Sequence, residues 1–212
     1  MRNLESVTTR VDLIRHGEPQ GGRMFRGATD HPLSEEGWSQ MRHAVNEQSP
    51  WDVIITSPLL RCSEFAHELG TQHNIPVIEV KSFAELYLGD WEGLTYPEAR
   101  ALSDDGHSID DVTAFWMNPD LNAIPNGETL EAFDHRVDEA WRELIETYPG
   151  QHILVVAHLF TCNLILRQVI QQPLNNALLF DIPYAGLSRI RIDDSQNGRL
   201  TQVEWVCLTQ LP

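Results

Sequence analysis

Two arginines and two histidines follow short apolar stretches of the sequence at the points where those stretches end. Arg15 and His16 follow VDLI (11–14), Arg61 follows WDVIIT (51–56), and His158 follows HILVVA (152–157). Continuous apolar runs of this length are typical of buried strands in a parallel sheet. Because ligands bind beyond the carboxyl ends of such strands, we expect these four side chains to meet at one edge of the sheet.

A group of this composition suits the chemistry of a phosphate monoester. Reaction at phosphorus needs positive donors around the non-bridging oxygens, a nucleophile in line, and an acid for the leaving oxygen. Arg15 and Arg61 carry planar guanidinium groups that stay charged and match phosphate geometry. Nearby guanidinium charge lowers the pKa of His16 and favours the neutral imidazole that can attack. Gly17 lets the backbone approach a ligand, and His158 can donate a further hydrogen bond, most strongly when protonated.

Each of these residues also has an ordinary structural explanation when it is taken alone. A histidine at the end of a strand is most often a satisfied structural residue, and an arginine most often belongs to a surface ion pair. Only the joint placement of the four side chains at three strand ends points to a phosphate site.

The remaining sequence predicts the elements that position this site. Apolar runs and alternation predict strands, and 3.6-residue periodicity predicts helices. The expected strands are 11–14, 51–56, 76–80, 152–157, 187–192 and 200–206, and the expected helices lie within 34–45, 62–69, 130–144 and 160–171. Asn197 and Gly198 are expected to form the turn between the last two strands. Strand–helix alternation predicts an α/β protein: a three-layer α/β/α sandwich with a mostly parallel central sheet.

The segment 85–126 departs from this alternation. It is irregular and rich in Gly, Pro, Asp and aromatic residues, and a long stretch of that kind is usually an insertion or a functional loop. We therefore expect one domain over residues 1–212, with a core of about 7–84 and 127–206 and a small cap insertion of about 85–126.

Composition and charge exclude several classes of function. The chain has 15 Lys and Arg against 31 Asp and Glu, which gives a net charge of −16 and argues against binding nucleic acid or an anionic membrane. No apolar run approaches the roughly 18 residues that span a bilayer. The three cysteines form no CxxC pair, which suits reduced thiols in a cytoplasmic protein. The nine histidines form no metal-binding motif, so no metal or other cofactor is expected.

A series of short motifs resembles the histidine phosphatase (phosphoglycerate mutase-like) superfamily. The first is RHGE at 15–18, and the second is SPLLRC at 57–62, which is similar to the family's SPLxR segment. The others occur in the family's order: Glu85-Leu86, GDWEG at 89–93, NGET at 126–129 and VAH at 156–158. Together they cover most of the chain.

The resemblance implies roles for five residues. His16 would form a phosphohistidine intermediate that is then hydrolysed, and the phosphate would be bound by Arg15, Arg61 and His158. Glu85 would protonate the leaving alkoxide and later act as the base for the attacking water. A carboxyl group near a dianionic phosphate has a raised pKa, which suits that role. Without the resemblance, Glu85 is one acidic residue among many.

The sequence departs from the family pattern at three places. Leu159 and Phe160 stand where many members have Gly-Gly, which narrows the room near the phosphate. Pro19 replaces a common Thr, and Gly22 replaces an Asn that contacts phosphate in many members. These changes remove neither the nucleophile nor the acid.

The cap sequence favours a phosphatase over a mutase. Mutases of the family use an Arg pair in the cap to hold a second acidic group, whereas the segment 86–126 contains only Arg100. The segment 15–37 is similar to the α-ribazole-5′-phosphate phosphatases of cobalamin assembly. Four aromatic residues of the cap would either stack on a base-like leaving group or pack the cap on the core: Tyr87, Trp91, Phe115 and Trp116.

The expected function is thus hydrolysis of a small phosphate monoester. Three alternatives stay open from the sequence: a phosphoglycerate mutase, a broad-specificity phosphatase, and a non-catalytic module that binds phosphorylated ligands. The sequence leaves the oligomeric state open as well.

Overall fold

One six-stranded mixed sheet forms the centre of the protein. The structure is a computed structural model that describes residues 6–46, 49–102 and 110–211. The strand order is β3-β2-β4-β1-β5-β6. The strands are β1 (Val7–Arg15), β2 (Val53–Thr56), β3 (Val77–Glu79), β4 (His152–Ala157), β5 (Leu187–Ser195) and β6 (Gly198–Leu208). β3, β2, β4 and β1 run parallel, and β5 and β6 complete the sheet as an antiparallel pair.

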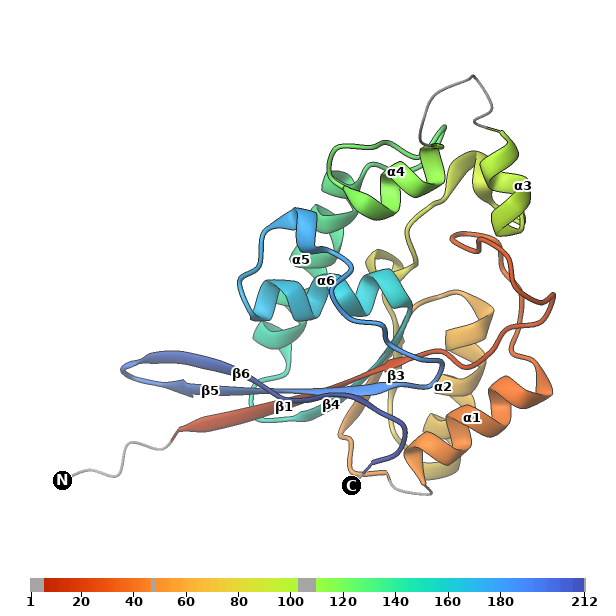
Figure 1. Ribbon diagram of the computed structural model, residues 1–212. Coiled ribbons are helices and arrows are strands. Elements are labelled where there is room, and N and C mark those ends of the chain that lie inside the picture. The colour runs from red at the N-terminus through yellow and green to blue at the C-terminus, as the bar shows by residue number, and fades with distance from the viewer. Residues whose placement is uncertain (1–5, 47–48, 103–109, 212) are drawn as a thin grey trace.

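Helices cover both faces of this sheet, as Figure 1 shows. α1 (Glu35–Val45) and α2 (Leu60–His73) lie on one face, and α5 (Leu130–Thr147) and α6 (Leu159–Val169) lie on the other. The strands supply both cores by alternation: Leu13 of β1 packs in the α5/α6 core, and its neighbour Ile14 packs in the α1/α2 core. The predicted three-layer α/β/α architecture with a mostly parallel sheet is confirmed.

The segment between β3 and α5 stands beyond the α5/α6 layer (Figure 1). It contains the short helices η1 (Lys81–Phe83), η2 (Gly89–Trp91), α3 (Tyr96–Ala101) and α4 (Asp111–Met117). Trp91 and Phe115 are 1% and 2% exposed and pack edge to face in the α5/α6 core. Of the four aromatic residues discussed above, these two therefore pack this segment on the core, whereas Tyr87 and Trp116 are partly exposed.

Several element boundaries differ from the sequence prediction. β1 begins at Val7 rather than at residue 11, because its polar first half pairs with β5 from Val7 opposite Asp194. α6 begins at Leu159 and ends at Val169, directly after His158 as N-cap. The turn of the β5–β6 hairpin consists of residues 196 and 197 rather than 197 and 198. Gly198, with φ of +125°, is the first residue of β6. A short helix, η3 (Leu174–Asn176), precedes β5.

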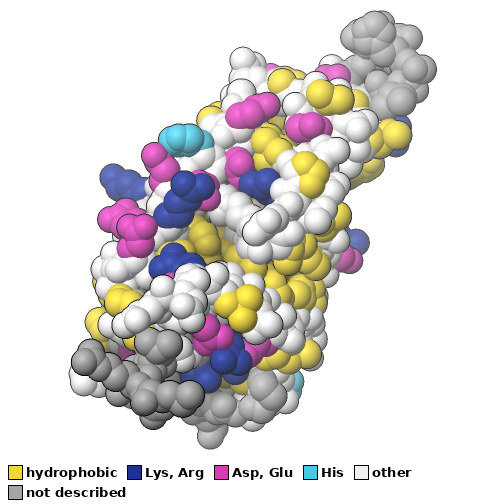
Figure 2. Space-filling view, turned by 90° about the vertical axis from the view of Figure 1, so that its left-hand side faces the viewer, with side chains coloured by type: hydrophobic (Ala, Val, Ile, Leu, Met, Phe, Trp, Pro, Cys, Tyr) yellow, Lys and Arg dark blue, Asp and Glu magenta, His cyan; other side chains and the backbone are white. Residues whose placement is uncertain are grey.

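The surface seen in Figure 2 mixes charges of both signs. Lys and Arg side chains lie beside Asp and Glu side chains, and no basic patch extends over this face. Of the helices that the structure describes, none has the length and apolar character required to cross a membrane.

A buried carboxylate ties β1 to β4 and β5. Asp12 is fully buried and accepts hydrogen bonds from Arg189 Nε at 2.6 Å and Trp51 Nε1 at 2.9 Å, and its Oδ2 lies 2.9 Å from His152 Nε2. Burial by itself would raise the pKa of Asp12, but the bonds to His152 and Arg189 outweigh it, so this pKa is lowered.

We expect Asp12→Asn to lower the free energy of unfolding by about 3 kcal/mol. The asparagine carries no charge, so the Arg189 guanidinium loses its ion-pair partner. A lowered pKa stabilises the fold above the unfolded Asp value of about 3.9, and the gain is lost as pH falls through the folded value. Urea denaturation at pH 7 and pH 3 measures both effects. Asp194→Asn, in an exposed pair with Arg199, is the control, with a change of less than about 1 kcal/mol. Equal losses in the two variants would contradict the account.

Candidate active site

The structure brings the two predicted histidines together at the carboxyl edge of the sheet. β1 and β4 are parallel neighbours in which Arg15 pairs with Ala157, so His16 and His158 emerge at the same level. Their ring centroids are 5.2 Å apart. The His16 backbone is fixed on two sides, because its N–H donates to Ala157 O and its carbonyl accepts from Ala185 N.

The ring of His16 is oriented by the residue that follows it. Nδ1 lies 2.7 Å from the carbonyl oxygen of Gly17, an acceptor only, so Nδ1 carries the proton and Nε2 carries the lone pair. No described residue forms a hydrogen bond with Nε2. The side chain is 6% exposed. Burial, and then the charges of Arg61 and Arg15, lower the pKa of His16 well below its usual value, which keeps the ring neutral.

Gly17 is required for the close approach of this turn to α1. A Cβ at Gly17 would lie 2.2 Å from the carbonyl oxygen of Gly37, in the first turn of α1. That turn is held in place by Ser34, whose hydroxyl accepts a hydrogen bond from Gly37 N as the helix N-cap. A side chain at position 17 would therefore displace the carbonyl that orients His16.

Arg15 lies between the end of β1 and the chain that leads into β5. Its Nη1 donates to Ile182 O at 2.5 Å, and its guanidinium lies 4.3 Å from the centre of the Tyr184 ring. Its Nε is buried, and none of the described residues forms a hydrogen bond with it. Arg15 therefore keeps a donor for a ligand.

Arg61 and His158 lie behind His16 and are fully buried. Arg61 Nε donates to His158 Nδ1 at 3.2 Å, and Ser57 Oγ lies 2.7 Å from His158 Nε2. Nδ1 of His158 is thus the acceptor nitrogen. Burial, and then the charge of Arg61, lower the pKa of His158 well below its usual value, so the structure favours a neutral ring rather than the protonated donor considered from the sequence.

The two guanidinium charges are not neutralised by protein carboxylates. Among the described residues, no ion pair involves Arg15 or Arg61, whereas most of the other described arginines form one. Arg61 instead donates to the backbone carbonyls of Gly27 at 2.7 Å and Thr29 at 2.9 Å. One fully buried and one partly buried cation, with no ion-pair partner among the described residues, make this edge of the sheet electropositive in a chain with a net charge of −16.

Glu92 fixes the loop that receives Arg61. Its carboxylate accepts from the backbone N–H groups of Gly27, Ala28 and Thr29 and from the Thr29 hydroxyl. The backbone N–H groups of this loop therefore face the Glu92 carboxylate, and its carbonyl groups face the Arg61 guanidinium. Position 27 must be glycine, because a Cβ there would lie 2.1 Å from Leu86 O.

Glu85 reaches the same site from the segment beyond β3. Its side chain is 7% exposed, and it accepts hydrogen bonds from the backbone N–H groups of Phe160 and Leu86, each at 3.1 Å. Burial raises the pKa of Glu85, and these two bonds and the charges of Arg61 and Arg15 only partly offset it. The Leu159-Phe160 pair thus still supplies a backbone donor to the carboxyl group.

One pocket of about 210 Å³ adjoins these groups. Three of the predicted residues line it, namely Arg15, His16 and Glu85. The rest of its wall is mainly apolar and aromatic, with one further cation: Met24, Phe25, Arg26, Leu88, Trp116, Leu159, Phe160 and Tyr184.

Sequence reasoning did not find Tyr184, although its ring centroid lies 5.8 Å from that of His16. The sequence indicates Tyr184 only indirectly, through the pairing of β5 with β1. β5 runs antiparallel to β1, with Leu187 opposite Ile14, so the residues before β5 lie at the carboxyl end of β1. An antiparallel pairing of these strands, had it been predicted, would have placed Tyr184 beside His16. Arg26, which also lines the pocket, lies within the segment 15–37 and has no role assigned from the sequence.

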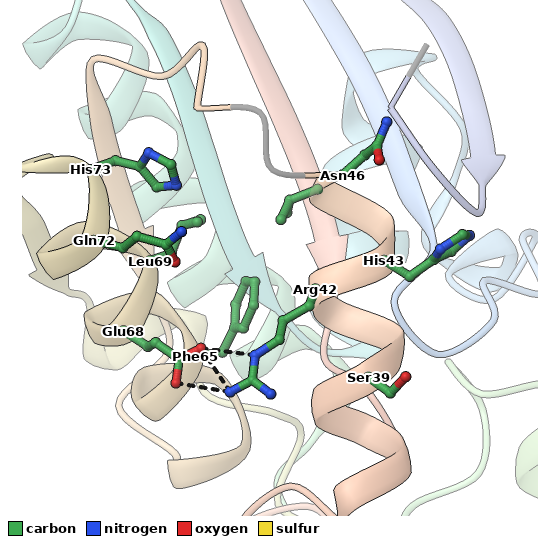
Figure 3. A pocket seen from close by; sticks show the side chains of 10 residues that line it. Ser39, Arg42, His43, Asn46, Phe65, Glu68, Leu69, Gln72 and His73 are labelled. Carbon is green, nitrogen blue, oxygen red and sulfur yellow. Dashed lines mark hydrogen bonds and ion pairs between the residues drawn. The ribbon is translucent and has the colours of Figure 1, made fainter.

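A larger pocket of about 460 Å³ lies between α1 and α2 (Figure 3). Its Arg42 is paired with Glu68 at 3.0 Å, so this cation is already neutralised. None of the predicted site residues lines it. The smaller pocket at the strand ends is therefore the candidate active site. Within the described ranges, no group of three or more His, Cys, Asp and Glu side chains is placed to hold a metal ion.

Comparison with known proteins identifies the family. Residues 11–205 match the family model of the histidine phosphatase superfamily (branch 1), and the chain belongs to this superfamily. It is 30% identical to the uncharacterized phosphatase PhoE of Bacillus subtilis (strain 168), over 76% of this chain and 77% of that protein. It is also 30% identical to the adenosylcobalamin/α-ribazole phosphatase of Escherichia coli (strain K12), over 77% and 80% of the two chains.

Among solved structures, YhfR of Bacillus stearothermophilus superimposes with a TM-score of 0.82 at 25% sequence identity, over 96% of this chain and 98% of that one. Fold, family and relatives together define the protein as a phosphoric monoester hydrolase, with the fold of phosphoglycerate mutase-like proteins.

Proposed function

We propose that the protein hydrolyses a small phosphate monoester, without a metal ion, through a phosphohistidine intermediate on His16. The observation that carries this proposal is the environment of His16. Its pKa is lowered, which keeps the ring neutral, and its Nδ1 proton is held by Gly17 O. No described residue binds its Nε2, and the residue lines one pocket together with Arg15 and Glu85.

In the first step the lone pair on His16 Nε2 attacks phosphorus as the bond from phosphorus to the leaving oxygen breaks. Glu85, protonated because its pKa is raised, gives its proton to the leaving oxygen. Arg15 and Arg61 stabilise charge on the non-bridging oxygens. His158 is neutral and carries its proton on Nε2, where it faces Ser57 Oγ. Once the phosphate displaces Ser57 Oγ, the His158 Nε2–H would donate a hydrogen bond to a non-bridging oxygen.

In the second step a water molecule attacks the phosphorus of phosphohistidine. Glu85, now a carboxylate, takes a proton from this water, and the bond between phosphorus and Nε2 breaks with its electron pair returning to the His16 ring. Inorganic phosphate leaves, and Glu85 is protonated again for the next cycle.

We also propose that the segment 85–126 acts as a cap within a single domain spanning residues 1–212. Support comes from its contribution to the pocket, to which it supplies Glu85, Leu88 and Trp116. The absence of an Arg pair supports a phosphatase rather than a mutase, because Arg100 is the only arginine in the sequence of 86–126 and it pairs with Asp110 at 2.7 Å.

For the substrate we propose a monoester whose leaving alcohol carries a planar apolar ring. The leading candidate is α-ribazole 5′-phosphate, in the cobalamin biosynthesis of the cytoplasm. The named relative from Escherichia coli and the aromatic wall of the pocket support this choice. Trp116 and Phe160 lie with ring centroids 5.7 Å apart, and Trp116 is 41% exposed, which leaves part of its ring for a ligand. The free cysteines of the structure suit a reducing compartment.

We expect phosphate release to be faster from α-ribazole 5′-phosphate and aryl phosphates than from sugar phosphates. Trp116→Ala should lower kcat/KM for the aromatic esters about 5- to 10-fold, because stacking contributes about 1 kcal/mol, and should change the value for sugar phosphates little. Tyr87→Ala is the control, since Tyr87 is a similarly exposed residue of the same segment that does not line the pocket.

Equal losses for aromatic and sugar esters in Trp116→Ala would contradict the proposed substrate class. Two results would favour the alternative functions. Isomerisation of a phosphoglycerate that depends on a bisphosphorylated primer, and outpaces phosphate release, would indicate a mutase. Binding of phosphate without turnover of any ester would indicate a non-catalytic module.

A further inference from the structure

The chain that carries Glu85 has no strand or α-helix to hold it. Residues 84–88 lie between η1 and η2. A general acid must nevertheless be fixed to within a fraction of an ångström, because a misplacement of about 1 Å costs on the order of 100-fold in rate. Something outside this segment must therefore position Glu85.

Three backbone carbonyls in and after η1 accept hydrogen bonds from one side chain of α5. Arg136 donates from Nη1 to Ser82 O at 2.7 Å and to Ala84 O at 2.9 Å, and from Nη2 to Glu85 O at 3.1 Å. Ser82 lies within η1, and Ala84 and Glu85 directly follow it. The guanidinium thus binds the backbone on both sides of the Glu85 Cα rather than the Glu85 carboxyl group.

The two remaining N–H groups of Arg136 are held by Glu128, which precedes α5. Nε donates to Glu128 Oε1 at 2.7 Å, and Nη2 donates to Glu128 Oε2 at 2.8 Å. All five donors of the guanidinium are therefore used. Glu128 N also donates to Tyr87 O at 2.9 Å, which fixes the segment on the far side of Glu85.

Burial and position separate this arrangement from an ordinary surface ion pair. The Arg136 and Glu128 side chains are 25% and 19% exposed, and the Arg136 guanidinium lies 4.5 Å from the centre of the Phe133 ring. Neither side chain lines the pocket. On the opposite side, the Glu85 carboxyl group is received by Phe160 N at the start of α6.

We infer that Arg136 and Glu128 are positioning residues for the general acid: they hold the backbone of Glu85 so that its carboxyl group stays between α6 and the leaving oxygen. This inference rests on the proposed function, in which Glu85 protonates the leaving group. A lysine at position 136 offers only three donors and no planar fork, so it cannot replace the arginine fully.

The test measures kcat/KM for an aryl ester, p-nitrophenyl phosphate, and for an alkyl ester, glycerol phosphate. The aryl oxide leaves without a proton, whereas the alkoxide needs one, so the ratio of the two values reports how well the acid is placed. We expect Arg136→Gln to raise the aryl-to-alkyl ratio about tenfold or more, Arg136→Lys to raise it less, and Glu128→Gln to raise it in the same direction.

Arg142→Gln is the matched control, because Arg142 is an arginine of the same helix that is 70% exposed and paired with Asp138. It should leave the ratio unchanged. Glu85→Gln, measured alongside, separates this inference from the proposed function. If Glu85→Gln raises the ratio but the Arg136 and Glu128 variants do not, the positioning role is wrong and the function stands. If Glu85→Gln leaves the ratio unchanged, the acid role itself fails and the inference with it.

Thermal denaturation of each variant shows whether it folds. Should Arg136→Gln fail to fold, Glu128→Gln decides, because it keeps the size of the side chain and the three carbonyl bonds of Arg136. An equal loss on both esters in the folded variants would indicate a merely structural role and would overturn the inference.

Discussion

Replacement of His16 by alanine is expected to abolish turnover, with kcat falling by on the order of 10⁴-fold or more. The reason is that no other histidine, and no cysteine, serine or threonine, among the described residues lines the pocket beside Arg15 and Glu85. His158 cannot substitute, because its two ring nitrogens face Arg61 and Ser57. Release of p-nitrophenol at saturating ester measures the effect.

His135→Ala is the matched control for this variant. His135 lies on α5, is 73% exposed and faces Glu139, so its loss should leave kcat within about twofold. Full turnover by His16→Ala would remove His16 from the mechanism, whatever its surroundings.

Replacement of Glu85 by glutamine is expected to slow hydrolysis of alkyl esters by about 10²- to 10⁴-fold, the range of general acid catalysis. Glutamine keeps the shape of the side chain, but its single amide oxygen can accept from only one of the two N–H groups that bind Glu85, those of Phe160 and Leu86, and it has no acidic proton to give. Formation of the intermediate from an aryl ester should be affected far less. Steady-state kinetics on the alkyl ester and a rapid-mixing burst on the aryl ester measure these two effects.

The pH dependence of kcat/KM gives an independent view of the same variant. The pKa of Glu85 is raised by burial, so the acid stays protonated above its usual range and activity on alkyl esters falls as pH rises through the raised value. The pKa of His16 is lowered, so the acid limb lies below about pH 6.5. In Glu85→Gln the alkaline limb should vanish and the acid limb remain. An unchanged alkaline limb would assign it to another group.

The part of the site that the sequence predicts by itself is the part that parallel strands place. Arg15, His16 and His158 follow β1 and β4, and the carboxyl ends of parallel strands necessarily meet at one edge. Arg61, on the first turn of α2, follows from the same rule. These positions need only the strand assignments, which apolar runs make clear.

Glu85 could not be found in this way, and only the family resemblance pointed to it. Its position depends on contacts with residues far along the chain: Arg136, 51 residues later, holds its backbone, and Phe160, 75 residues later, binds its carboxyl group. Local sequence contains no trace of such contacts. The same holds for Trp116 and Phe115, adjacent residues of one short helix, of which one lines the pocket and the other is buried in the core.

The His158 environment shows a second kind of limit. The sequence predicts that His158 lies at the end of a strand. Its protonation state, however, depends on burial and on Arg61, whose Nε faces its Nδ1. Protonation states of this kind follow from the packed site and not from the order of the residues.

The most direct test of the account is to trap the covalent intermediate. The protein is mixed with a phosphate ester labelled at phosphorus, quenched in alkali within milliseconds, and digested for mass spectrometry. Alkali preserves a phosphoramidate bond at histidine, so we expect one labelled peptide, with phosphate on His16 in the wild type and none in His16→Ala. Label on a different residue, or alcohol release with no labelled peptide at any quench time, would contradict a phosphoryl transfer to His16.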